Sequence, residues 1–140
     1  MSDLTIQHLD TKSLSNYESW FDNRATANML FKQSEGQDLS NLGSQAWSGS
    51  IDGQVVAVAF FSTDIMHHGH FYLAVKQSER RHGYGTEMMK QVLSEPIVRD
   101  LVSNHVTIEP ENVGAQKILR KTGFVQTGYT SEGYLEFEKL

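Results

Sequence analysis

The chain has 140 residues, of which 39% are hydrophobic, and it carries a formal net charge of −5 with no cysteine. This length and composition predict one domain, residues 1–140, whose core is large enough to need no disulfides. The absence of cysteine excludes thiolate metal ligands and a covalent thiol mechanism, and the acidic balance argues against general nucleic-acid binding. No stretch is apolar for long enough to span a bilayer, and residues 1–3 do not resemble a signal peptide, so we expect a cytoplasmic protein without membrane contact.

The first third of the chain combines strand and helix signals. Residues 4–9 alternate enough to predict a first strand, and Ser15 with Glu18 forms a capping box that predicts the start of a helix. A second helical piece covers residues 24–31. A polar, glycine-containing loop follows it over residues 34–43.

Two strands joined by a tight turn form the clearest hairpin. Residues 46–51 and 54–62 flank Asp52 and Gly53, which favour the positive φ angles of a type I′ turn. The second of these strands is apolar on both faces, and so are residues 71–75. This pattern predicts central strands of a sheet that is covered on both sides.

A glycine-containing hexapeptide, Arg80-Arg81-His82-Gly83-Tyr84-Gly85, separates residues 71–75 from a helical stretch over residues 86–94. The two glycines let the backbone approach a ligand, so that amide N–H groups and the positive end of the following helix converge on one anion. The hexapeptide lacks both the third glycine of a dinucleotide fingerprint and the Gly-Lys-Ser/Thr ending of a P-loop. It predicts a pyrophosphate site, with a surface turn that caps a helix as the alternative.

The last third of the chain predicts a strand, a helix and a strand pair. Residues 106–108 form the short strand. Asn112 is placed to cap the helix, which Gly123 ends in the left-handed conformation. The strand pair covers residues 124–129 and the alternating segment around Leu135.

The order of these elements and two separated motifs resemble the GNAT superfamily of acyl-CoA N-acyltransferases, over nearly the whole chain. The family's pyrophosphate motif is Gln or Arg, two residues, Gly, one residue, Gly or Ala, and Arg80, Gly83 and Gly85 meet it. Its second motif, from an asparagine to a Gly-Phe pair, is met from Asn112 to Phe124. The resemblance implies an α/β fold with a central, mostly antiparallel mixed sheet, splayed middle strands and helices on both faces.

The resemblance also implies an acetyl-CoA site in the opening where strands 71–75 and 106–108 separate. Asn112 would contact the cofactor arm there, unless it is only a helix cap. Backbone groups of one strand would hold the pantetheine and polarise the thioester: Leu73, Ala74 and Val75. The pyrophosphate would lie against the hexapeptide and the next residue: Arg80, Arg81, His82, Gly83, Tyr84, Gly85 and Thr86.

Without cysteine, acetyl transfer would be direct, with an amine attacking the thioester carbonyl. A general base must take a proton from an alkylammonium whose pKa is about 10.4, and a backbone N–H of Leu73 or Val75 would stabilise the charge on the carbonyl oxygen. Glu109, just past a strand end, is the first candidate for the base, and His70 is the second. Many relatives place a tyrosine acid where this chain has Leu119, but a thiol pKa of about 8.5 lets the thiolate leave unaided.

Two groups of side chains have structural as well as functional interpretations. Three histidines lie at a predicted hairpin bend, where we expect no metal site because cysteine is absent: His67, His68 and His70. Three aromatic side chains either pack in the core or line an acceptor pocket: Trp20, Phe21 and Trp47.

The sequence therefore predicts an acetyl-CoA-dependent N-acetyltransferase that transfers acetyl directly to a primary amine. The acceptor is either a small amine or a protein N-terminus or lysine. The alternative is a non-catalytic acyl-CoA-binding or regulatory module. We expect neither a metal nor a nucleic-acid partner, and a homodimer is left open.

Overall fold

The computed structural model describes residues 4–10, 13, 16–17, 20, 45–63, 66–79 and 82–140. Within them a seven-stranded sheet runs in the order β1-β2-β3-β4-β5-β7-β6. Its strands are β1 (Thr5–Leu9), β2 (Gln45–Ile51), β3 (Gln54–Thr63), β4 (His68–Val75), β5 (Ser103–Ile108), β6 (Val125–Tyr129) and β7 (Leu135–Lys139). All neighbouring strands are antiparallel except β4 and β5, which run parallel, so the predicted mixed and mostly antiparallel sheet is confirmed.

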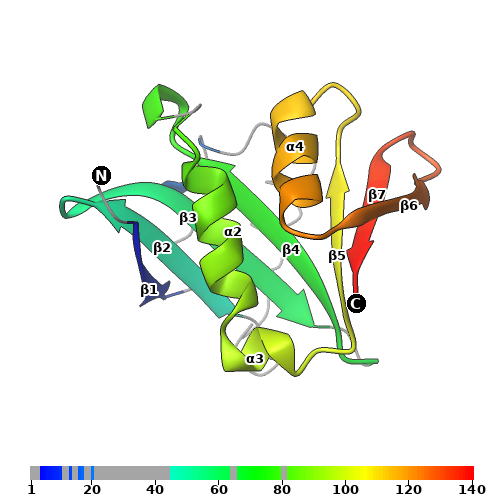
Figure 1. Cartoon of the computed structure of the whole chain (residues 1–140), viewed down its shortest axis with the longest axis horizontal. Helices are drawn as coiled ribbons and strands as arrows, with labels where there is room; N and C mark the ends of the chain where they lie inside the picture. Colours follow the sequence, from blue (N-terminus) through cyan, green and yellow to red (C-terminus); the bar gives the residue numbers. More distant parts are fainter. Residues whose placement is uncertain are drawn as a thin grey trace.

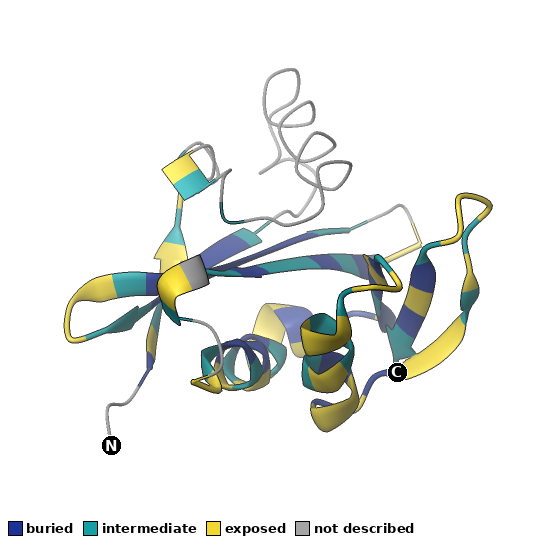
Figure 2. Cartoon of the chain, turned by 90° about the horizontal axis from the view of Figure 1, so that it is seen from above, coloured by how far each residue is buried: buried dark blue, intermediate teal, exposed yellow. Residues whose placement is uncertain are grey.

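The helices of the described region lie on one face of this sheet. Helices α2 (Tyr84–Leu93) and α4 (Val113–Lys121) run side by side across it, and the short α3 (Pro96–Arg99) follows α2 (Figures 1 and 2). A single 3-10 turn, η3 (Gln77–Glu79), precedes α2. The helices predicted between residues 15 and 31 lie largely outside the described residues.

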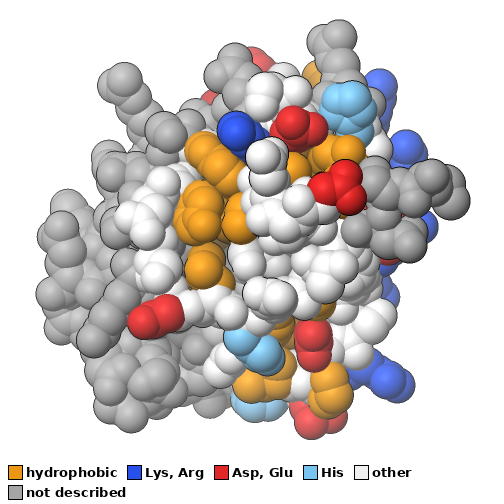
Figure 3. Space-filling view, turned by 90° about the vertical axis from the view of Figure 1, so that its left-hand side faces the viewer, with side chains coloured by type: hydrophobic (Ala, Val, Ile, Leu, Met, Phe, Trp, Pro, Cys, Tyr) orange, Lys and Arg blue, Asp and Glu red, His pale blue; other side chains and the backbone are white. Residues whose placement is uncertain are grey.

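The core fills the space between the sheet and the two long helices. Trp47, Phe61 and Phe71 come from successive strands, with ring centroids 5.5 Å and 5.3 Å apart, and they pack over Met88 and Met89 of α2. Trp47 is fully buried, which decides for this residue in favour of the core. Seen from the β1 end of the sheet, acidic side chains are scattered singly among hydrophobic and uncharged ones (Figure 3).

Local signals in the sequence correctly located the turns that close these elements. Asp52 and Gly53 have φ angles of 51° and 80°, which confirms the type I′ turn between β2 and β3. Gly123, with φ 97°, ends α4 in the left-handed conformation. The amide of Phe124 then donates to the carbonyl of Leu119 at 2.9 Å, a helix-ending bond that satisfies a carbonyl of the last turn.

The predicted starts of two strands were wrong. β4 begins at His68 and β5 at Ser103, because polar residues that carry no hydrophobic alternation pair across these strands. His67 has a positive φ of 66° just before β4, but His68 and His70 belong to β4 rather than to a bend.

Strand β4 is paired very differently along its two edges. Seven residues, from Gly69 to Val75, have partners in β3, whereas only His68 to His70 have partners in β5. Beyond His70 the two parallel strands diverge, as Figure 1 shows. The splayed middle strands implied by the family resemblance are therefore present, and their opening faces α2 and α4.

Candidate active site

The diverging edge of β4 exposes backbone polar groups to the opening. The amide of Lys76 donates to the carbonyl of Val56 at 2.8 Å, which sets the hydrogen-bonding phase of the antiparallel β3–β4 ladder. Because that phase alternates, the N–H and C=O groups of Phe71, Leu73 and Val75 point away from β3 and toward β5. Leu73 lies beyond the last β4–β5 pair, so its N–H has no ladder partner on β5.

A cleft of about 600 Å³ occupies this opening and reaches both faces of the sheet. On the helix face it is lined by Leu73 and Val106, which belong to or pack against the core under α2 and α4. On the other face it is lined by Tyr72, whose ring lies 5.9 Å from Phe60, and by Thr107. The divergence of the two strands thus makes a slot through the sheet.

The N-terminus of α2 forms one end of the cleft. Its cap residue, Gly83, has φ 81° and makes no side-chain cap, so the first amides of the helix are not satisfied by a capping side chain. A Cβ built on Gly83 would meet no atom within 4 Å. The backbone is therefore open to a ligand at this point, and the positive end of the helix dipole favours an anion.

The other residues of the hexapeptide are placed differently from one another. Gly85 is buried, and a Cβ there would lie 2.6 Å from Cδ1 of Ile118, the flexible end of an α4 side chain, so α2 and α4 pack closely at this glycine. Tyr84 and Thr86 line the cleft, whereas His82 is exposed and stacks on Tyr84 at 5.4 Å. Arg80 and Arg81 lie outside the described residues.

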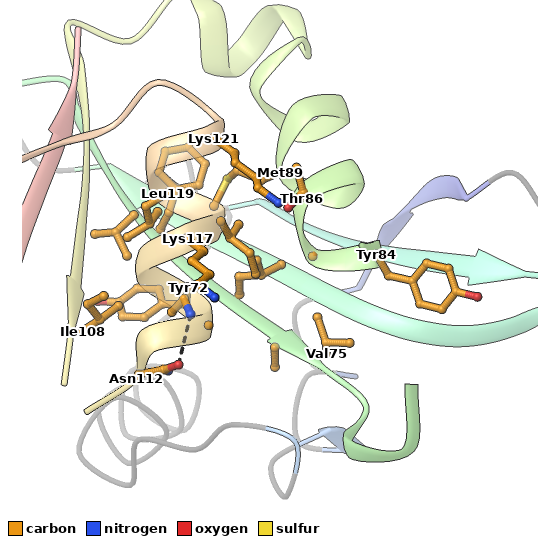
Figure 4. Close-up of a pocket in the computed structure, with 18 of the residues that line it drawn as sticks. Tyr72, Val75, Tyr84, Thr86, Met89, Ile108, Asn112, Lys117, Leu119 and Lys121 are labelled. Carbon is orange, nitrogen blue, oxygen red and sulfur yellow. Dashed lines mark hydrogen bonds between the residues drawn. The ribbon is translucent and has the colours of Figure 1, made fainter. Parts of the chain in front are cut away.

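Helix α4 forms the opposite wall and presents side chains rather than backbone. Asn112 caps it, because its Oδ1 accepts from the amide of Ala115 at 3.1 Å (Figure 4). Leu119, at the position of the expected tyrosine, is buried with 2% of its surface exposed. Lys117 and Lys121 also line the cleft, one helical turn apart.

The family model for the acetyltransferases of the GNAT family matches residues 7–124. The chain belongs to the GNAT acetyltransferase family. Spermidine N-acetyltransferase from Vibrio cholerae, solved with CoA and spermine, is similar in structure, with a TM-score of 0.76 and 14% identity over 98% of this chain and 95% of that one. No curated protein matches the chain by sequence.

A second group of solved GNAT-like structures comprises aminoglycoside acetyltransferases. AAC(6')-Ib in complex with ribostamycin and coenzyme A has a TM-score of 0.71 and 14% identity, covering 98% of this chain and 93% of that one. A structure of the same enzyme with paromomycin and acetyl-CoA gives a TM-score of 0.70. At these identities the likeness shows the shared fold, while the family model shows membership.

The two predicted bases of this acetyltransferase occupy different places. Glu109, half-buried at the end of β5, lines the cleft. His70 lies at the closed end of the opening, where β4 and β5 are still paired, and its ring stacks on that of His105 at 5.4 Å. The described lining residues of the cleft include Glu109 but neither histidine.

His70 belongs to a polar cluster that the sequence did not reveal. The hydroxyl of the buried Ser103 lies 2.6 Å from Nδ1 of His68 and 2.8 Å from Nε2 of His105. Since a hydroxyl carries one proton, it donates to one of these rings and accepts from the other. Among the described residues, no group of histidines and carboxylates has the arrangement of a metal site.

Four polar or charged lining residues to which we give roles below or on the cleft wall were missed in the sequence: Tyr72, Glu79, Lys117 and Lys121. Burial raises the pKa of the Tyr72 hydroxyl above its ordinary value of 10.0. The spacing of Lys117 and Lys121 after Asn112 is a usable signal, because residues four apart share one face of a helix. Trp20 also lines the cleft, which favours the pocket interpretation for that residue, while Phe21 lies outside the described residues.

Within the described ranges, no helix is long and apolar enough to cross a membrane.

Proposed function

We propose that this acetyltransferase uses acetyl-CoA and transfers the acetyl group directly to a primary amine. The observation that carries the proposal is the slot through the sheet, which has Leu73 of β4, without a partner on β5, at its centre and the open N-terminus of α2 at one end. A donor bound along the helix face and an acceptor entering from the other face would meet in that slot.

The residues present fit acetyl-CoA. The pantetheine arm is a chain of amides, and the backbone N–H and C=O groups of Leu73 and Val75 face the space that such an arm would occupy. The open surface above Gly83 and the uncapped amides of α2 suit a pyrophosphate. When bound there, acetyl-CoA supplies an acyl thioester.

The N–H of Leu73 is the donor we assign to the thioester oxygen. It is held in a strand whose other edge is fully paired with β3, so its direction is set before any ligand arrives. A preorganised donor stabilises the negative charge that builds up on this oxygen and needs no rearrangement during the reaction.

Glu109 is the base that we favour over His70. A primary ammonium must lose a proton before it attacks, and a general base that accepts it contributes about 10²–10⁴-fold in rate. Glu109 lines the cleft itself, whereas His70 would need a water or another side chain to reach the amine.

Tyr72 is the group we assign as the hydrogen-bond donor to the leaving sulfur, in place of the tyrosine acid expected where this chain has Leu119. It lies in β4 beside Leu73 and lines the slot. Burial raises its pKa, so the hydroxyl stays protonated at neutral pH and would stabilise the departing thiolate by donating a hydrogen bond to it, without giving up its proton.

The acceptor class is proposed from where the charges lie and from similar structures. Two carboxylates, Glu79 and Glu109, line the cleft and would attract a cationic amine to their part of it, while the two lysines of the lining belong to α4. Similar structures were solved with spermine and with aminoglycosides, which are polycationic amines. We therefore place polyamines and amino sugars first, before protein N-termini and lysines.

The test is a screen of polyamines, aminoglycosides and N-terminal peptides with acetyl-CoA, read as release of the coenzyme A thiol. Saturable release that needs both substrates is expected. If acetyl-CoA binds but no thiol appears above the rate without amine, the chain is an acyl-CoA-binding module and the proposed transfer is wrong.

A further inference from the structure

The two halves of the sheet are joined by a short seam between β4 and β5. These strands pair only from His68 to His70, whereas the other neighbouring strands of the described sheet have four to seven pairs of residues. One backbone bond reinforces the seam, from the amide of Val102 to the carbonyl of His67 at 3.0 Å. The seam is therefore the vertex from which the two strands diverge to open the slot (Figure 1).

The two faces of the seam carry different side chains, because successive residues of a strand point to opposite faces. On the helix face, Gly69 lies against the core: a Cβ added to it would be 2.5 Å from Cδ1 of Leu101. Four polar side chains, two from each strand, therefore lie on the face away from α2 and α4: His68, His70, Ser103 and His105.

A single hydroxyl ties the two strands together on that outer face. Oγ of Ser103 lies 2.6 Å from Nδ1 of His68, across the seam, and 2.8 Å from Nε2 of His105, two residues along β5. The ring of His105 lies 5.4 Å from the rings of both His68 and His70. Only 1% of the surface of Ser103 is exposed, so water does not compete for its bonds. Because hydrogen bonds are directional, this network favours one angle between the strands.

The reacting groups lie well beyond the seam on both strands. Leu73 follows His70 by three residues and Glu109 follows His105 by four, which places them about 10 Å and about 13 Å along the chain from the vertex. A change of about 6° in the angle between the strands would move one group relative to the other by about 1 Å, a displacement that costs about 10²-fold in rate.

We propose that Ser103 is a positioning residue for the acetyl transfer. By joining His68 of β4 to His105 of β5, its hydroxyl fixes the angle at which the two strands separate. That angle sets how the backbone donor of Leu73 is aligned with Glu109. The inference rests on the proposed transfer, although Ser103 itself does not line the cleft.

The helix layer is the other part of the fold that bridges the two strands. α2 follows β4 and α4 follows β5, and the two helices pack together where Gly85 meets Ile118. If the helices alone set the strand angle, removal of the Ser103 hydroxyl would leave the rate unchanged. A substitution confined to the seam therefore separates the two explanations.

The first experiment compares Ser103→Ala with Ser48→Ala. Ser48 is also a buried strand serine, but it lies in β2, away from the seam. With acetyl-CoA and an amine from the screen, kcat should fall about 10- to 100-fold in Ser103→Ala, while the affinity for acetyl-CoA stays within about twofold. The affinity is kept because the donor is held by β4 and α2, on one side of the seam. Ser48→Ala should keep the wild-type kcat.

Three outcomes of this comparison would overturn the inference. An unchanged kcat in Ser103→Ala would assign the strand angle to the helices. Parallel losses of kcat and of acetyl-CoA affinity would indicate general damage to the fold. An equal loss of kcat in Ser48→Ala would indicate an effect of stability alone.

His105→Phe tests the same contact at a half-buried position, where a substitution is better tolerated than at Ser103. Phenylalanine keeps a ring beside His70 and removes the nitrogen that bonds to Ser103. We expect kcat to fall here too, and Ser103→Ala/His105→Phe should lose no more than the larger of the two single losses, because both substitutions disrupt one network. Additive losses would contradict a shared network.

A distance measurement tests the strand angle without any substrate. The chain has no cysteine, so spin labels on two introduced cysteines report a single distance. Lys76→Cys and Glu111→Cys place the labels at exposed positions that follow β4 and β5. In this background, Ser103→Ala should shift or broaden the distance distribution by about 1 Å or more, whereas Ser48→Ala should not.

An unchanged distance distribution in Ser103→Ala would also overturn the inference. If the wild type releases no thiol with any amine, the proposed transfer is wrong, and the distance measurement still decides whether Ser103 sets the strand angle.

Discussion

The two walls of the cleft offer different kinds of groups to a ligand. The wall formed by β4 and α2 offers backbone, namely the unpaired edge at Leu73 and the open helix start at Gly83. The wall formed by β5 and α4 offers side chains, chiefly Glu109 and the two lysines, while the start of α4 is closed by its own cap at Asn112.

This difference separates what the fold supplies from what individual residues supply. A backbone wall depends on strand divergence and on one glycine, so most of its side chains are free to vary. A side-chain wall depends on particular residue types, so removal of the ammonium proton by Glu109 is set there, and Tyr72 of β4 is the exception on the backbone wall. Substitutions on the two walls should therefore fail in different ways.

The largest effect is expected from Glu109→Gln, on the side-chain wall. If Glu109 is the base, kcat should fall roughly 100-fold while the affinity for acetyl-CoA stays within about twofold, because only proton transfer is lost. Steady-state kinetics with an amine identified in the screen would measure this. Glu111→Gln removes an exposed carboxylate from the same loop and should retain the wild-type rate. An unchanged kcat in Glu109→Gln would exclude Glu109 as the base.

Gly83→Val probes the backbone wall. We expect acetyl-CoA to bind at least about tenfold more weakly, because the added side chain occupies the open surface above the α2 N-terminus and the residue resists a φ of 81°.

Gly53→Val is the matched control for this variant. Gly53 lies in the β2–β3 turn with φ 80°, and a Cβ added to it would likewise meet no atom within 4 Å. Gly53→Val should lose about as much stability as Gly83→Val, but it should keep the wild-type affinity for acetyl-CoA. Equal affinities of the two variants in a calorimetric titration would place the pyrophosphate elsewhere.

Asn112→Ala tests whether the start of α4 is a cap or a ligand contact. Because Oδ1 of Asn112 accepts from the amide of Ala115, we expect the free energy of unfolding to fall by about 1 kcal/mol. Chemical denaturation would measure the loss, and Asn112→Ser, which preserves a capping oxygen, should recover most of it. A variant with wild-type stability but weakened acetyl-CoA binding would contradict the capping role.

The smallest effect concerns Tyr72 and alkaline stability. Burial raises the pKa of its hydroxyl above 10.0, so the folded chain keeps a proton that the unfolded chain loses. The stability linked to this group is present below about pH 10 and is lost as the pH rises through the folded pKa. Tyr72→Phe should therefore make the decline of unfolding free energy above pH 10 shallower. Urea denaturation between pH 8 and pH 11 would detect it, and an identical decline in both proteins would show that Tyr72 does not contribute.

Much of the fold could be predicted because its signals are local. The Asp52-Gly53 turn and the Gly123 helix end each depend on backbone preferences of one or two residues. The starts of β4 and β5 could not be predicted, because His68 and Ser103 are polar and enter strands only through pairing with each other's strand. The same long-range pairing brings Ser103 to His68, and this contact could not be predicted because the two residues are far apart in the sequence.

The sequence by itself determined the family, through Arg80, Gly83 and Gly85 and through the segment from Asn112 to Phe124. Only the tertiary structure decided what each motif residue does. Gly83 is open to a ligand, whereas Gly85 is buried in contact with Ile118, although both satisfy the same pattern. A motif records which residue types are permitted at a position, but the reason for a missing side chain lies in the atoms around it. Those atoms come from α4, more than thirty residues along the chain, and folding alone brings them together.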